Sequence, residues 1–321
     1  MYAPKKQMDI HVRFLEDGCV TSRFFGSEFL GHARAEDLLQ HIKECVAKLN
    51  MRNLLSVGMD GPNVNFRFLD LLQKEHGELH GGAETISVGS CGLHTLHNAL
   101  KAGFTEWSIE KLLRAMHFLF NNVPARREDF TNITKSTSFP LPFCGHRWIE
   151  NVPVAERAVE VWPKLQLYVD AALKKKVQKP SSASFDTVVA ATGDPLIVPK
   201  IQFFLAIARS FNPFLTQYQM DDPVLPFLAK DLTELLMSLL RRFIKREVLQ
   251  DRTPRQLIQI EAAEERNWIS PKNVDIGLGA ESAVKVMSSF SSTHPSYLLR
   301  VEKRISSPLS HLSSAWMSSC L

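Results

Sequence analysis

Residues 54–63, Leu-Leu-Ser-Val-Gly-Met-Asp-Gly-Pro-Asn, decide the fold class of this chain. The run Leu54–Met59 is short and mostly apolar, which is typical of a buried strand. It ends in a turn that begins at Asp60, and Asn63 can cap a helix that continues to Glu75. A strand that leads through a tight turn into a helix predicts an α/β layer around Asp60.

The segments on either side of this run complete an α/β subdomain. Ile10–Phe14 and Val20–Phe25 read as strands, and the turn residues Glu16-Asp17-Gly18 between them predict a hairpin. Ala35–Leu49 carries its apolar residues on one helical stripe. Thr85–Val88 is a further short strand, so the expected order is hairpin, helix, strand, helix, strand.

The rest of the chain reads as helical. Helices are expected at Cys91–Ala102, Ser108–Phe120, Val154–Leu173, Pro199–Phe211 and Asp231–Arg246. The third of these should break or kink near Pro163. The resulting fold class is α/β plus all-α, with an α/β subdomain over residues 1–103, a helical domain over 104–286 and a serine-rich tail over 287–321 that we expect to be disordered.

Composition narrows the class of protein. The chain has 321 residues, 45% hydrophobic residues and a net charge of only +4, which is too small to indicate nucleic-acid binding by itself. Its five cysteines are odd in number and widely spaced, and no apolar signal core opens the sequence. We therefore expect free thiols in a reducing compartment, the nucleus or the cytoplasm. No apolar run approaches the roughly 20 residues that cross a bilayer, so no membrane partner is expected.

Asp60 is the first candidate for a chemical role. An acid at the carboxyl end of a buried strand is well placed to hold a divalent metal. Two-metal phosphodiester chemistry, however, needs several carboxylates around one point. The alternative, favoured by spacing alone, is that Asp60 opens a turn and caps a helix.

A second candidate is a zinc site. Cys91 and His94 form a CxxH pair, and Cys144 with His146 could complete a tetrahedral set. The alternative, which we favour from the sequence, is that Cys91 is a small buried residue and the histidines are hydrogen-bonded at a helix start.

A third candidate is the pair Arg147-Trp148. A guanidinium beside an exposed indole can hold a phosphate and stack on a flipped or single-stranded base. A tryptophan packed in the core at a helix start is an equally good interpretation. The basic clusters Arg126-Arg127, Lys174–Lys176 and Arg241-Arg242 are more typical of solvated faces than of DNA contacts.

Four blocks of sequence together resemble the hAT superfamily of cut-and-paste DNA transposases, and most closely the host proteins derived from them. The blocks are Met59–Asn65, Ser90–His94, Pro124–Asp129 and Cys144–Trp148, and the resemblance spans roughly residues 7 to 286. It implies an RNase H-like fold interrupted by a large helical insertion, and DNA cleavage by an Asp-Asp-Glu set with divalent metal. Asp60 matches the second acid, Cys91 and His94 the CxxH pair, and Arg147 and Trp148 the pair that handles DNA ends.

The chain also departs from that family. The strand that bears the first acid is expected upstream of Gln7–Val12 and is missing, and Asp9 is a poor substitute. The final Glu is expected after the insertion, but the resemblance stops near Val284, and Glu302 lacks the matching context. Losing two acids of such a set removes metal-dependent cleavage. The absent strand should also leave an exposed edge in a truncated RNase H-like mixed sheet.

The sequence therefore predicts a transposase-derived protein that is not an enzyme and needs no cofactor, although the family uses a divalent metal. Its expected partners are DNA or a protein that covers the exposed sheet edge. Three alternatives stay open: a subunit or fragment of an active metal-dependent transposase, a zinc-stabilised helical scaffold, and a gene product without a selected function.

Overall fold

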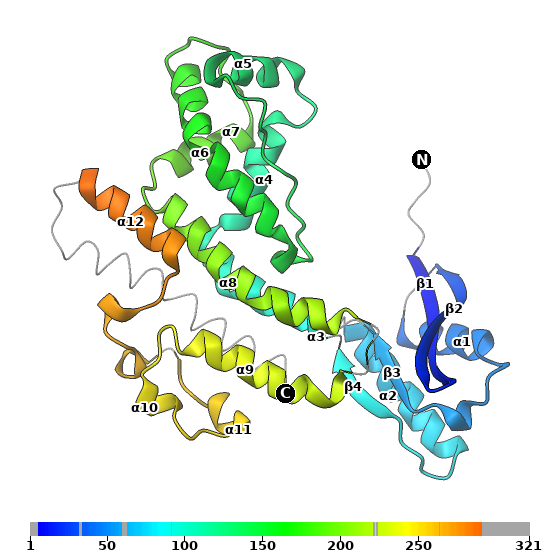
Figure 1. Cartoon of the computed structure of the whole chain (residues 1–321). Coiled ribbons are helices and arrows are strands. Elements are labelled where there is room, and N and C mark those ends of the chain that lie inside the picture. Colours follow the sequence, from blue (N-terminus) through cyan, green and yellow to red (C-terminus); the bar gives the residue numbers. More distant parts are fainter. Residues whose placement is uncertain are drawn as a thin grey trace. The chain divides into compact units, whose positions relative to one another are not determined.

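The computed structural model describes residues 6–31, 34–59, 63–90, 92–220, 222, 224–262 and 264–290. They fall into two compact units. The first unit contains the chain up to Leu96 together with Gln217–Pro226, and the second contains His97–Thr216 and the residues from Phe227 on (Figure 1). The boundary at Leu96 lies inside a helix, α3 (Gly92–Phe104).

The first unit opens with the predicted hairpin. Strand β1 (Lys6–Glu16) pairs with β2 (Cys19–Leu30) in an antiparallel ribbon, and both strands are longer than the sequence suggested. The turn residues Asp17 and Gly18 have φ angles of 51° and 80°. Positive φ at both central residues defines the turn whose twist matches a hairpin, and glycine adopts it without steric cost.

The stretch from which the fold was read forms a β-α-β arrangement. Strand β3 (Ser56–Met59) is followed by α2 (Asn63–Leu79), and β4 (Ile86–Ser90) then pairs with β3 in parallel. Helix α1 (Ala35–Cys45) precedes β3 and ends four residues before the predicted Leu49. The order of elements expected for this part of the chain is confirmed.

The predicted single mixed sheet does not form among the described strands. Instead β1–β2 and β3–β4 are two separate two-stranded sheets. Both pack on one layer of helices, because Leu38 of α1 and Phe68 of α2 share a core against which Met8 of β1 and Val57 of β3 are packed. The helices, rather than a shared ladder of hydrogen bonds, therefore join the two sheets. The mixed α/β and all-α class holds, while an RNase H-like core stays a prediction.

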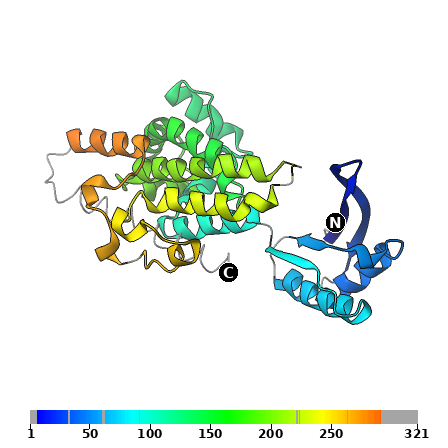
Figure 2. The same ribbon diagram turned by 60° about the horizontal axis from the view of Figure 1, so that its bottom comes forward.

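The second unit is built from helices. They are the rest of α3, α4 (Ile109–Phe120), α5 (Pro124–Thr134), α6 (Val152–Leu173), α7 (Ala183–Thr192), α8 (Ile197–Tyr218), α9 (Leu228–Leu240), α10 (Arg246–Leu249), α11 (Pro254–Leu257) and α12 (Leu278–Phe290). Helix α8 packs on α3, because Phe104 of α3 meets Phe203 and Phe204 of α8 with ring centroids 5.8 and 5.3 Å apart. Figure 2 shows the helices of this unit from a second direction. These aromatic contacts place a continuous core at the centre of the helical unit.

Helix α6 is continuous across Pro163. Of the two predicted alternatives, a break or a kink, continuity excludes the break, and the kink stays a prediction. Proline removes one backbone hydrogen bond from the helix. The buried side chains Val161, Trp162 and Leu165 on both sides of Pro163 hold the helix in the core and offset that loss.

The C-terminal part of the chain is described only as far as Phe290. Helix α12 includes residues 287–290, which the sequence had placed in the serine-rich tail, and the rest of that tail lies outside the described residues. Within the described part of the chain, no single helix is long and apolar enough to cross a membrane. One bent pair, Ala183–Thr192 with Ile197–Tyr218, reaches the required length and composition at an angle of 98°.

Candidate functional site

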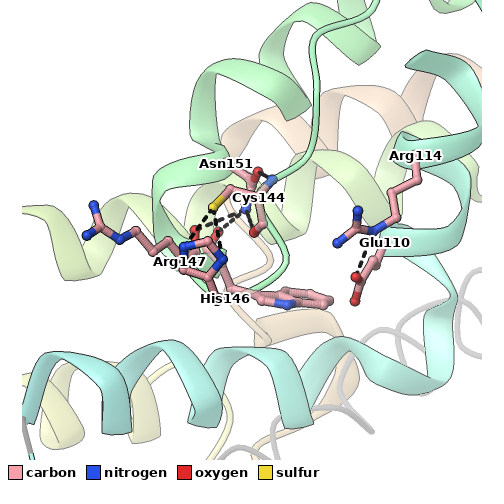
Figure 3. A network of polar contacts seen from close by, with 7 residues as sticks. Glu110, Arg114, Cys144, His146, Arg147 and Asn151 are labelled. Carbon is pink, nitrogen blue, oxygen red and sulfur yellow. Dashed lines mark hydrogen bonds and ion pairs between the residues drawn. The ribbon is translucent and has the colours of Figure 1, made fainter. Parts of the chain in front are cut away.

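Four of the predicted site residues lie in the segment 143–151, which connects α5 to α6. They are Cys144, His146 and Arg147 (Figure 3) and Trp148, which begins a short 3-10 helix, Trp148–Asn151. We refer to residues 143–151 as the connecting loop. Its conformation decides which of the proposed chemical roles its side chains can fill.

The side chain of Asn151 holds the connecting loop in shape. The Cys144 backbone N–H donates to Asn151 Oδ1 at 2.7 Å. Asn151 Nδ2 is placed 2.9, 3.0 and 3.2 Å from the carbonyl oxygens of Cys144, Arg147 and Trp148. Asn151 is only 1% exposed, so these contacts satisfy an amide that would otherwise be costly to bury. No role for Asn151 was predicted from the sequence, although its place directly before Val152-Pro153 at a helix start is a capping signal.

A charged pair on α4 covers the other side of the connecting loop. Arg114 Nε donates to Glu110 Oε1 at 2.8 Å, and the guanidinium lies 5.4 Å from the centroid of the Phe143 ring. A Cβ at Gly145 would come within 2.2 Å of Arg114 Nη2. Glycine at this position therefore lets the guanidinium lie directly against the loop backbone. Neither Glu110 nor Arg114 was singled out from the sequence.

Half of the proposed zinc set converges. Cys144 Sγ lies 3.7 Å from both ring nitrogens of His146. Cys91 lies outside the described residues, and His94 Nδ1 is buried without a hydrogen-bond partner. No group of three metal-ligating side chains occurs within the described ranges. The structure thus brings Cys144 and His146 together and leaves a complete zinc site as a prediction.

Arg147 and Trp148 point to different environments. Trp148 is 1% exposed and packs edge-on against Phe143 and Phe204, with ring centroids 5.3 and 6.2 Å away. Arg147 is exposed and forms an ion pair with Glu150 at 3.3 Å. The indole therefore lies where the second interpretation, a tryptophan packed in the core, places it. A base could stack on it only after the core around it opened.

A buried histidine supports the same loop. The Ile149 backbone N–H donates to His97 Nδ1 at 3.2 Å, and His97 is 5% exposed. His97 lies on α3, so this bond ties the connecting loop to a helix 52 residues away in sequence. The interpretation that the histidines of this segment are hydrogen-bonded therefore holds for His97, whereas His94 Nδ1 is buried without a hydrogen-bond partner among the described residues.

One remaining candidate lies outside the described residues, and the others lie within them. Asp60 lies outside the described residues, although β3 and α2, which flank its turn, have the predicted order. The basic clusters make local contacts: Arg127 lies 4.2 Å from the Phe139 ring centroid, Lys174 pairs with Asp170 at 2.8 Å, and Arg242 lies 3.6 Å from Asp275. The exposed Lys174 pair is typical of a solvated face, whereas the Arg242 side chain is only 18% exposed and its Nη1 is buried without a hydrogen-bond partner in the described part of the chain.

Comparisons of this chain with protein-family models, with curated proteins and with solved structures give no match. The fold therefore defines a protein of two units. One is a small α/β unit that contains a pair of two-stranded sheets, and the other is a larger helical unit. The geometry of the connecting loop is that of a rigid structural element built on Asn151, with a thiol–imidazole pair beside it.

Proposed function

We propose that this protein is derived from an hAT-type transposase, no longer cuts DNA, and acts in the nucleus by binding a protein partner along the unpaired strand edges of its first unit. The four sequence blocks from Met59–Asn65 to Cys144–Trp148 support the ancestry. One of the three acids of the resembled set, Asp60, stands in a matching context, and one acid cannot position two metals.

The observation that carries the interaction role is the pair of two-stranded sheets. Each described strand has a partner on one side only, so backbone N–H and C=O groups along its other side remain to be paired. Parallel sheets are normally buried and larger than two strands. Ile86 of β4 is nevertheless 62% exposed. A strand supplied by a partner would pair these edges and extend the core over α1 and α2.

A protein is favoured over DNA as the partner by the burial of Trp148. The base-handling role that the resemblance implies needs an exposed indole, and this indole is packed between Phe143 and Phe204. Arg147 alone, paired with Glu150 on the surface, offers a single exposed charge.

The loss of cleavage is tested with purified protein, duplex DNA and Mn²⁺. We expect no nicked or joined product, because metal-dependent cleavage needs carboxylates that the sequence around Asp60 does not supply. Asp60→Ala serves as the control and should match the wild type. Cleavage by the wild type that disappears in Asp60→Ala would overturn the proposal.

The strand-edge role is tested by proline at Gly58. Ser56, Val57 and Met59 pair with β4, whereas Gly58 falls at the irregularity in the register, and a Cβ there meets no atom within 4 Å. Gly58→Pro should therefore keep β3 paired with β4 and prevent addition of a strand on the other side. In affinity capture from a nuclear extract we expect a partner held by the wild type and by the control Gly31→Pro, and lost from Gly58→Pro. Retention of the same partner by a folded Gly58→Pro chain would contradict this role.

A zinc-stabilised scaffold is the second candidate function, and the convergence of Cys144 and His146 favours it. This candidate predicts that about one zinc ion per chain survives dialysis and that Cys144→Ser releases it together with some thermal stability. His117→Gln, which changes a histidine bonded to the Pro140 carbonyl instead, is the matched control. Metal analysis that finds no zinc in the wild-type protein ends this candidate.

A further inference from the structure

The β1–β2 hairpin has one face on the helices and one face in solvent. Side chains alternate across a strand, and directly opposed residues of paired strands share a face. Met8 packs on the core, so residues 8, 10, 12 and 14 of β1 lie on the inner face of the ribbon, although Phe14 near the tip is 37% exposed. The other face carries the opposed pairs Gln7–Phe29, Asp9–Ser27, His11–Phe24, Arg13–Ser22 and Leu15–Val20. We call this set of ten residues the outer hairpin face.

Large apolar side chains are exposed on the outer hairpin face. Leu15, Phe24 and Phe29 are 71%, 60% and 62% exposed, and they lie near the tip, at the middle and at the base of the ribbon. His11 packs edge-on against Phe24 with ring centroids 5.7 Å apart. Single exposed apolar residues are normal on a protein surface, but three large ones on one small ribbon form a patch.

The charges of this face are ordered as well. Asp9 Oδ1 accepts hydrogen bonds from Ser27 Oγ at 2.6 Å and from Gln7 Nε2 at 2.8 Å. These bonds lower the pKa of Asp9, and they hold the carboxylate on the base side of the central His11–Phe24 pair. Asp9 and Arg13 are each two residues from His11 along β1, and Arg13 lies on the side of that pair nearer the tip of the hairpin. From the tip of the hairpin to its base, the outer hairpin face therefore presents an apolar, a basic, an aromatic, an acidic and again an apolar side chain.

We propose that the outer hairpin face binds the same face of a second copy of this chain, with the two ribbons stacked in opposite directions about a twofold axis through the His11–Phe24 pair. This axis sets Phe24 against its counterpart and Arg13 opposite Asp9 of the other copy. It also sets the Leu15–Val20 pair over Gln7–Phe29. Phe24 then meets Phe24, Val20 meets Phe29 and opposite charges meet twice, while Leu15 lies opposite Gln7, and this self-complementarity is what a twofold interface requires.

The charges select this arrangement over the other twofold stacking. If the ribbons ran in the same direction, Arg13 would lie opposite Ser22 and Asp9 opposite Ser27, and like charges would be close to one another across the axis. Only the opposed stacking pairs each arginine with an aspartate.

The size of the face sets the strength of the contact. A ribbon of about ten residues per strand is about 35 Å long and about 10 Å wide, so each copy would contribute roughly 350 Å². A standard stable interface buries about 800 Å² per partner. Because each copy contributes less than half of that area, we expect a weak dimer that forms where the protein is concentrated. This contact uses the face of the hairpin, not its edges, and does not depend on the proposed function.

Sedimentation velocity of the full chain over roughly 1–200 μM tests the proposal. The weight-average mass should rise from 36.3 kDa toward twice that value. Phe24→Ser should weaken association at least about tenfold, because it removes the central contact from both copies. Phe118→Ser changes an equally large side chain, 53% exposed on α4 of the other unit, and should leave association unchanged.

A charge exchange tests the direction of stacking. Asp9→Arg and Arg13→Asp should each weaken association, since each places like charges together twice. The double variant Asp9→Arg/Arg13→Asp should restore it. Thermal midpoints equal to that of the wild type establish that these surface variants fold.

Three outcomes overturn the proposal. The chain could remain a 36.3 kDa monomer over the whole concentration range. It could associate equally well with and without Phe24→Ser, which would place the interface elsewhere. Failure of the double charge variant to recover association would exclude the opposed stacking.

Discussion

Trp148→Ala is expected to lower the free energy of unfolding of the helical unit by about 3–5 kcal/mol, the usual cost of removing a large aromatic side chain from a core. The indole is 1% exposed and is enclosed by Phe143 on the connecting loop and Phe204 on α8. Its loss would leave a cavity at the point where the loop meets the aromatic core. Urea denaturation followed by circular dichroism measures the change.

Two variants separate packing from a role in base handling. Trp148→Phe keeps most of the apolar volume and removes an Nε1–H that is buried without an acceptor in the described structure, so it should cost much less than alanine. Phe118→Ala, on the exposed surface, should change the stability by no more than about 0.5 kcal/mol. A Trp148→Ala protein with unchanged stability that had instead lost an affinity for single-stranded DNA would show that the indole works on nucleic acid and not in the core.

Asn151→Ala is expected to cost about 3 kcal/mol, because it leaves the Cys144 N–H and several carbonyl groups of the connecting loop without their partner. Asn151→Asp is the informative companion. Its carboxylate can still accept from the Cys144 N–H, but it cannot donate, and it faces the carbonyl oxygens of Cys144, Arg147 and Trp148 with a negative charge. At neutral pH we expect Asn151→Asp to be at least as destabilising as alanine.

The shape of the connecting loop gives a second readout for Asn151. Cys144 is partly buried beside His146, so a loop released from Asn151 should expose the thiol and speed its reaction with a thiol reagent. Cys144→Ser in the same background identifies the signal, since other thiols remain. Equal stability and equal thiol reactivity in Asn151→Ala and the wild type would mean that the loop is held by other contacts, such as the Arg114–Glu110 pair.

Elements with a strong local pattern were predictable from the sequence. The Asp17-Gly18 turn fixes the hairpin, because positive φ at both positions suits few other pairs of residues. The regular apolar spacing of Ile109–Phe120 defines α4, where seven side chains are buried. The apolar run at Leu54–Met59 correctly indicated a strand, and a helix begins at Asn63 as the sequence predicted.

Elements that depend on few buried groups were missed. Helix α5 is largely polar and buries only Phe130, and α7 buries Phe185 and Val188. Neither stretch has an apolar stripe long enough to be recognised, because most of the stability of such helices comes from contacts with neighbouring helices. The continuity of α6 through Pro163 has the same origin, since its flanking core side chains outweigh the local preference of proline.

The stretch Leu54–Asn63 and the residues around it determined by themselves the order of strands and helices, since alternation, turn chemistry and helical stripes are properties of neighbouring residues. The division into two separate two-stranded sheets was decided only in three dimensions, where both sheets pack on α1 and α2 rather than on each other. The same holds for the candidate site. Sequence could name Cys144, His146 and Trp148, but the Asn151 hydrogen bonds that shape their loop, and the Phe204 ring that α8 supplies, exist only in the folded chain. The Phe204 contact helps to enclose the indole, and the shape of the loop puts the thiol beside the imidazole.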